Sequence, residues 1–228
     1  MPTTYFTKDF FQFLTDLAAH NERSWFHANK DRFLATVQEP ALQFIADLEP
    51  KLAKVSPNFV ADPRPVGGSL FRIYRDTRFS KDKTPYKTHM AMNFRHRQGG
   101  EMHVPGFYLH LEPGACYAGM GLWRPEPRVA QMVRSAIADD AQGWKKATRA
   151  KAFTDVWKMD GESLVRPPKG FDPDHPLVED LKRKDFTAGS PVGQKQAASP
   201  GFLDDYLKML TPAKPFMAFL CTAVGVAF

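Results

Sequence analysis

Cysteine is scarce in this sequence, and the little there is forms no recognisable site. The 228 residues include two cysteines, Cys116 and Cys221, which lie far apart and belong to no CxxC pair. No Cys/His group has the spacing of a zinc site, so the sequence predicts no metal and no other cofactor. Free cysteines are usually buried. We therefore expect two reduced thiols in a core and a reducing, cytoplasmic location.

Long apolar runs are also missing. The longest, residues 216–228, is shorter than the roughly 20 apolar residues that span a bilayer. It predicts a buried terminal helix and no membrane partner. Residues 1–8 lack the basic start and apolar stretch of a secretory signal peptide, which agrees with an intracellular protein.

Several motifs of well-known enzyme classes are absent. No Gly-x-Ser-x-Gly elbow occurs, which disfavours an α/β-hydrolase, and no Walker A loop occurs. The Gly119-Met-Gly121 sequence lacks the third glycine of a dinucleotide fingerprint. Two interpretations of it stay open. The glycines allow a tight bend, or they present backbone N–H groups to an anion at a helix N-terminus.

Apolar residues and positive charge are both abundant in the sequence. Apolar residues make up 43% of the chain and charged residues 25%, which is typical of a folded globular protein. The 19 Phe residues need a packed interior. The net charge of +6 favours anionic partners, although it is smaller than that of most dedicated nucleic-acid binders.

The order of sequence patterns predicts an α+β fold in one domain, residues 1–228. Residues 1–55 have helical spacing, residues 69–120 read as a β meander, and residues 125–228 are mainly helical. Short connections between the strands favour antiparallel pairing. We therefore expect a central antiparallel sheet packed by the N-terminal and C-terminal helices.

One predicted strand alternates cleanly between apolar and polar residues. Phe107, Leu109 and Leu111 occupy one face of it, and Tyr108, His110 and Glu112 occupy the other. Successive side chains of a strand point to opposite faces of the sheet. The first set is therefore predicted to face the core.

The segment of residues 72–89 differs from the rest of the chain. It carries two Asp, a Ser, two Tyr and three Thr beside six cationic residues: Arg72, Arg75, Arg78, Lys81, Lys83 and Lys87. Arginine offers planar forked donors to phosphate and carboxylate, and lysine adds point charge. The segment predicts a binding site for a small anionic ligand that bears a phosphate or a carboxylate.

Two other interpretations of the segment remain open. Asp76 and Asp82 can pair with the cations and hold a scaffold that has no ligand. The cations and interleaved aromatic residues can also follow a nucleic-acid backbone and stack on bases. Whether the protein is an enzyme is left open. Tyr86, His89 and His110 are the candidates for proton transfer if it is one.

The first two arginines of the segment are expected to differ in role. Residues 70–75 have the composition of a strand, on which Arg72 and Arg75 point to opposite faces. We expect Arg72 to be buried and paired. Arg75, Arg78 and Lys83 are expected to point at the ligand.

Residues 72–89 resemble the hallmark of an uncharacterised protein family, domain of unknown function 2461. The resemblance continues along almost the whole chain, in this order: the Trp25-Phe26 pair, Tyr108-Leu-His110, Gly119-Met-Gly121-Leu-Trp-Arg-Pro125, Pro168-Lys-Gly170-Phe171-Asp172-Pro-Asp174-His175-Pro176 and Leu181-Lys182-Arg-Lys184. It implies one fold-sized unit and supplies no activity.

Overall fold

The N-terminal part of the chain is helical, as the spacing of its apolar residues predicts. The computed structural model describes residues 3–99 and 103–228. Its first elements are the helices α1 (Lys8–Ala19), α2 (Arg23–Ala28) and α3 (Lys30–Phe33), the π-helical turn η1 (Leu34–Gln38) and the helix α4 (Glu39–Val55). The π-helical turn runs into α4 without a break, because Gln38 and Glu39 both have helical backbone angles, and Pro40, which has no N–H to donate, directly follows this junction.

Within the described residues, six antiparallel strands form one sheet in the order β1-β2-β3-β4-β6-β5. The strands are β1 (Phe59–Val60), β2 (Met90–His96), β3 (Gly106–Leu111), β4 (Tyr117–Leu122), β5 (Lys158–Asp160) and β6 (Phe186–Pro191). The predicted α+β class is confirmed. The sheet extends beyond the predicted range of residues 69–120 on both sides, because β1 precedes it and β5 and β6 come from the C-terminal part. Residues 100–102 of the predicted meander lie outside the described residues.

The remaining helices come from the C-terminal part of the chain. They are α5 (Pro127–Asp139), α6 (Ala141–Arg149), α7 (Lys151–Thr154), α8 (Val178–Leu181), α9 (Gln194–Ala197), α10 (Phe202–Leu210) and α11 (Lys214–Ala223). None of the helices in the described part of the chain has the length and apolar character to cross a membrane. Cys116 and Cys221 are both free and buried, as expected.

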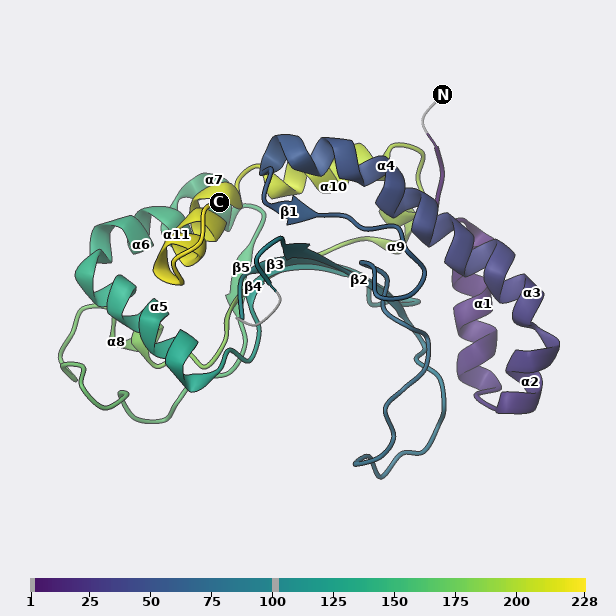
Figure 1. Ribbon diagram of the computed structural model, residues 1–228, viewed down its shortest axis with the longest axis horizontal. Helices are drawn as coiled ribbons and strands as arrows, with labels where there is room; N and C mark the ends of the chain where they lie inside the picture. The colour runs from purple at the N-terminus through teal and green to yellow at the C-terminus, as the bar shows by residue number, and fades with distance from the viewer. Residues whose placement is uncertain (1–2, 100–102) are drawn as a thin grey trace.

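The two faces of the sheet have different surroundings (Figure 1). Helices α4 and α10 cover one face, on which the Phe94 ring lies 6.0 Å from the Tyr206 ring of α10. Phe107, Leu109 and Leu111 are fully buried there, which confirms the predicted alternation of β3. The opposite face, called the polar face below, carries the side chains of Tyr108, His110 and Tyr117.

Residues 69–93 form a long hairpin that leaves the sheet on the side of the polar face (Figure 1). We call it the basic hairpin. Its two arms are joined by backbone hydrogen bonds and by the isolated bridges Leu70↔Met92 and Tyr74↔Tyr86. The prediction of a regular strand over residues 70–75 is wrong. Residues 70–75 make backbone hydrogen bonds to the other arm of the hairpin only at intervals, so the continuous ladder of hydrogen bonds that defines a strand does not form.

Candidate functional site

The basic hairpin is docked against the N-terminal helices by a polar clasp and an aromatic stack. The Asn21 side chain donates a hydrogen bond to the Tyr86 carbonyl oxygen (3.0 Å) and accepts one from the Tyr86 N–H (3.0 Å). The Phe26 ring of α2 stacks on the Tyr86 ring, with the ring centroids 4.2 Å apart. These contacts fix the spacing between α2 and the hairpin.

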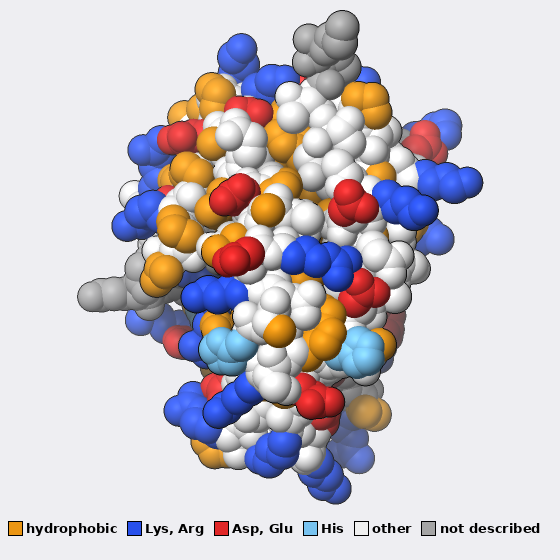
Figure 2. Space-filling model, turned by 90° about the vertical axis from the view of Figure 1, so that its right-hand side faces the viewer, with side chains coloured by type: hydrophobic (Ala, Val, Ile, Leu, Met, Phe, Trp, Pro, Cys, Tyr) orange, Lys and Arg blue, Asp and Glu red, His pale blue; other side chains and the backbone are white. Residues whose placement is uncertain are grey.

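A cavity of about 510 Å³ opens between α2 and the basic hairpin, and we call it the hairpin cavity. It is lined by Glu22, Arg23, His27, Tyr74, Arg75, Thr77, Lys83, Pro85 and Tyr86. Three of these residues are Lys or Arg, and Glu22 is the one acidic residue among them. Lys and Arg side chains gather at the lower end of this side of the molecule (Figure 2). The lining therefore favours anions.

Salt bridges inside the hairpin hold two of the predicted anion-binding arginines. Arg75 Nη1 donates to Asp82 Oδ2 (2.5 Å) and also to the Thr84 hydroxyl. Arg78 Nη2 pairs with Asp76 Oδ2 at 2.7 Å. The hydrogen bonds from these arginines lower the pKa of Asp76 and of Asp82 to about 2. Part of the segment therefore serves as scaffold.

Two of the lysines also contact the hairpin backbone. Lys83 Nζ donates to the Thr77 carbonyl oxygen at 2.8 Å, and Lys87 Nζ donates to the Arg72 carbonyl oxygen at 2.9 Å. A lysine ammonium has three donors, so each keeps capacity for a further acceptor. Lys83 lines the cavity, but Lys87 does not.

The expectation that Arg72 is buried and paired is wrong. Arg72 is exposed, and its side chain makes no ion pair with the described residues. Arg75 is instead the half-buried, paired arginine, since its guanidinium forms the ion pair with Asp82. The alternation rule for strands failed here because residues 70–75 do not form a regular strand.

The six cations of the segment do not converge on one site. Arg75 and Lys83 line the hairpin cavity, whereas Arg72, Arg78, Lys81 and Lys87 lie outside its lining. Lys81 is exposed and makes no ion pair with any residue that the structure describes. Arg23 and His27 of α2 complete the lining, and sequence reasoning missed them. The sequence did offer a sign of them, because both lie within two residues of the Trp25-Phe26 pair, which carries part of the family resemblance.

The three candidates for proton transfer lie at two places. Tyr86 is buried, and burial, followed by the neighbouring Tyr74, raises its pKa. His89 and His110 lie together on the polar face, with ring centroids 4.2 Å apart. Burial, followed by the neighbouring His110, lowers the pKa of His89 to about 4. The imidazole of His89 is therefore neutral at neutral pH.

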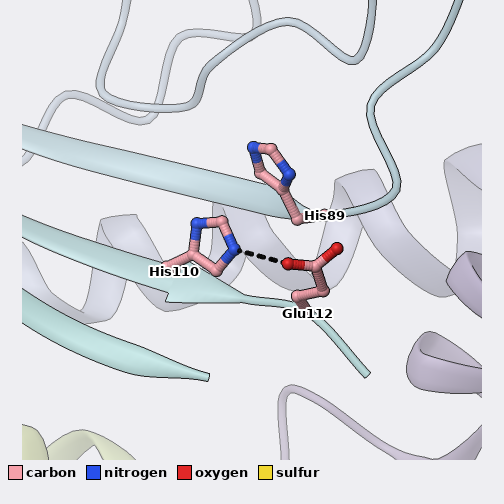
Figure 3. Close-up of side chains that lie close together, drawn as sticks. All are labelled: His89, His110 and Glu112. Carbon is pink, nitrogen blue, oxygen red and sulfur yellow. Dashed lines mark hydrogen bonds and ion pairs between the residues drawn. The ribbon is translucent and has the colours of Figure 1, made fainter. Parts of the chain in front are cut away.

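Glu112 joins the two histidines in a cluster that sequence reasoning did not identify (Figure 3). His110 Nε2 lies 3.2 Å from Glu112 Oε2, and Thr88 Oγ1 donates to Glu112 Oε1 at 3.0 Å. Burial disfavours the Glu112 carboxylate, yet the hydrogen bonds from His110 and Thr88 outweigh it and lower its pKa. The expectation of no metal site rested on local spacing. His89 directly precedes β2, whereas His110 lies at the end of β3 and Glu112 directly follows that strand. The spacing of residues along the sequence therefore does not reveal the cluster.

A larger cavity, of about 660 Å³, opens between α6, α7 and the C-terminal helices. Its lining is mostly apolar, with Ala147, Phe153 and Pro215 among its residues. A ligand site normally adds a few convergent polar groups that orient the ligand. The side chains of this lining that can form hydrogen bonds are two lysines and one threonine, and the lining includes no acidic residue and no histidine. We therefore assign no site here.

Comparison with known proteins identifies the family of the chain. No curated protein matches it. The family model described as conserved hypothetical protein DUF2461 matches residues 9–219, which include the hairpin cavity and the cluster on the polar face. The chain therefore belongs to the DUF2461 family of conserved hypothetical proteins.

Proposed function

We propose that the protein binds a small ligand bearing a phosphate or a carboxylate in the hairpin cavity. The observation that supports this most is the lining itself, in which Arg23, Arg75 and Lys83 meet around one space. Arginine and lysine differ in geometry, and together they suit the forked and point contacts of a phosphate.

The walls of the cavity also suit an anion that carries an organic group. Tyr74, Tyr86 and Pro85 supply flat apolar surface beside the cations. Small-ligand sites commonly combine such surface with a few charged groups that orient the ligand. A volume of about 510 Å³ lies within the usual range of about 300–1,000 Å³ for such sites. A phosphorylated metabolite of moderate size therefore fits the site better than a bare ion.

Lys83 and Lys81 provide a matched pair of variants that tests the proposal. Both are exposed lysines of the same loop, and only Lys83 lines the cavity. We expect Lys83→Ala to weaken pyrophosphate binding by at least about tenfold, because a hydrogen bond to a charged group contributes about 1.5–3 kcal/mol. Lys81→Ala should change the affinity less than about twofold. Isothermal titration with pyrophosphate and with AMP measures both.

The Lys83→Ala and Lys81→Ala substitutions each remove one positive charge, so a difference in affinity between the two variants does not arise from net charge. Arg23→Ala provides a second test, because Arg23 belongs to α2 and its loss leaves the Lys83–Thr77 contact intact. Equal losses for the Lys83 and Lys81 variants would indicate nonspecific attraction to the hairpin. A wild-type protein that binds none of the anions would refute the proposal.

A second candidate function is binding of single-stranded nucleic acid by the end of the basic hairpin. The observation that favours it is Phe79, whose side chain is 95% exposed and lies beneath the Arg78 guanidinium. Exposed aromatic rings beside cations are the usual platform for base stacking. Arg72 and Lys81 add exposed positive charge on the same hairpin.

Phe79→Ala separates this candidate from the first. Stacking on one aromatic ring contributes about 1–3 kcal/mol, so the variant should weaken oligonucleotide binding about tenfold. Pyrophosphate binding should stay unchanged, because Phe79 does not line the hairpin cavity. Binding of a labelled single-stranded oligonucleotide is measured by gel shift at several salt concentrations. Absence of a shift at low salt excludes this candidate, because backbone contacts are strongest there.

A further inference from the structure

The cluster on the polar face follows directly from the pairing of two strands. Met90 of β2 pairs with Leu111 of β3, so His89 and Glu112 follow as the next opposed positions. His110 lies two residues before Glu112, and alternate residues of a strand share a face. The register thus brings two imidazoles and one carboxylate to the same corner of the sheet.

We propose that His89, His110 and Glu112 bind a divalent transition-metal ion of the zinc type. One nitrogen from each histidine and one oxygen from the carboxylate lie within 4.8 Å of one another (Figure 3). Bond lengths of about 2.0–2.2 Å in a tetrahedral arrangement place the ligand atoms of one zinc ion about 3.3–3.6 Å apart. The donor atoms that lie farthest apart therefore need to approach by about 1.2 Å, through side-chain rotation, to bind an ion.

The chemistry of the three donors suits a metal of this type. Two histidines and one glutamate are a common ligand set for zinc and for related first-row ions. Calcium and magnesium prefer sites built from oxygen atoms alone, so the two imidazoles disfavour them. Among the residues that the structure describes, no other group of three His, Cys, Asp or Glu side chains meets the same distance limit.

Neighbouring residues hold two of the three ligands in place. The Tyr108 hydroxyl lies 2.9 Å from His110 Nδ1, and the Tyr117 ring stacks on the His110 ring at 4.7 Å. Thr88 binds one oxygen of Glu112. Hydrogen bonds of this kind to the second nitrogen of a histidine, or to a ligand carboxylate, orient the ligands of known metal sites.

Metal binding requires a defined change of proton position on His110. The contact of His110 Nε2 with Glu112 is satisfied when Nε2 carries the proton and donates it. A metal ion at Nε2 displaces that proton, and the neutral ring then carries its proton on Nδ1. The Tyr108 hydroxyl can accept from Nδ1 in that state and donate to it in the other. Tyr108 is therefore compatible with both forms.

The geometry assigns a site with free coordination positions rather than a closed structural site. Three protein ligands leave at least one position of a four-coordinate ion for water or substrate. The lining of the hairpin cavity includes none of the three ligands, so the metal proposal does not depend on the anion proposal.

Metal titration of the untagged protein tests this inference. We expect the wild-type chain to bind one Co²⁺ or Zn²⁺ ion, measured by calorimetry and, for Co²⁺, by its visible absorption. His89→Ala and Glu112→Gln should each weaken binding by at least about tenfold. His20→Ala serves as the control, because His20 is an exposed histidine outside the cluster. It should change the affinity less than about twofold.

A further variant distinguishes a positioned site from chance binding at surface histidines. Tyr108→Phe keeps the ring and removes only the hydroxyl beside His110, and it should weaken binding about 10–100-fold. Glu112→Gln still tests the site if His89→Ala fails to fold, since an amide keeps an acceptor for Thr88. The inference is overturned if the wild type binds no ion. Equal affinity of wild type, His89→Ala and Glu112→Gln would assign any binding to other histidines.

Discussion

Replacing Gly121 by alanine should lower the free energy of unfolding by about 4 kcal/mol, whereas the same change at Gly119 should be nearly neutral. Gly121 lies in β4 with φ at +111°, a conformation that residues with a side chain rarely adopt. A Cβ atom there would lie 2.1 Å from the Phe186 carbonyl oxygen of β6. Backbone strain contributes about 1–3 kcal/mol, and overpacking contributes a similar amount.

The atoms that a Cβ at Gly121 would meet belong to the backbone of β6 and not to a flexible side chain. The pairing of Gly121 with Thr187 holds β4 against β6, so relief of the contact requires the two strands to separate locally. Chemical denaturation monitored by circular dichroism measures the loss. A decrease of 4 kcal/mol should appear as a fall in melting temperature of roughly 8–16 °C for a chain of this size.

Gly119 is the control because it belongs to the same strand and the same face. A Cβ atom there would meet the Tyr108 ring at 3.6 Å, which is ordinary van der Waals contact. Alanine also restricts the unfolded chain more than glycine does, so Gly119→Ala should be neutral or stabilise by up to about 1 kcal/mol. Similar losses at both positions would show that the strain argument for Gly121 is wrong.

These two glycines illustrate what sequence reasoning missed in the fold. Gly119-Met-Gly121 was expected to form a bend or an anion-binding turn before a helix, yet both glycines lie inside β4. The need for Gly121 arises from β6, which follows more than 60 residues later in the chain. The alternation of β3 was predicted correctly because it depends on local sequence alone. Pairing between distant segments leaves no comparable local signal.

The candidate sites show the same limit. The excess of cations in residues 72–89 is visible in the sequence, and the hairpin cavity does include two of them, Arg75 and Lys83. Which cations converge depends on how the hairpin docks on α2, through Asn21 and Phe26. Ion pairs within the hairpin were among the expected alternatives, and the structure contains them alongside the cavity.

Replacing Tyr86 by alanine should cost about 3–5 kcal/mol, the usual loss for a large aromatic side chain removed from a core. Tyr86 is 2% exposed and stacks on Phe26, with Tyr74 packed beside it at 5.3 Å. Its loss would remove the main apolar contact between the basic hairpin and α2. Chemical denaturation should show the loss of stability, and pyrophosphate affinity should fall with it because one wall of the cavity is gone.

Tyr86→Phe separates this structural role from the chemical role considered for the hydroxyl. Phenylalanine keeps the stack on Phe26, and no hydrogen bond of the Tyr86 hydroxyl with another described residue is lost. Stability should therefore change by less than about 1 kcal/mol, as expected for a substitution that nearly conserves volume. Burial raises the pKa of Tyr86, so its phenol stays protonated at neutral pH and is a poor general base.

Pyrophosphate affinity of the stable Tyr86→Phe protein then decides the role of the hydroxyl. An unchanged affinity assigns Tyr86 to the wall of the cavity and leaves recognition of the anion to the cations around it. A loss of about tenfold without a loss of stability would instead place the hydroxyl among the groups that contact the ligand. The Asn21 clasp binds only the backbone of Tyr86 and is present in both variants, so it does not affect this comparison.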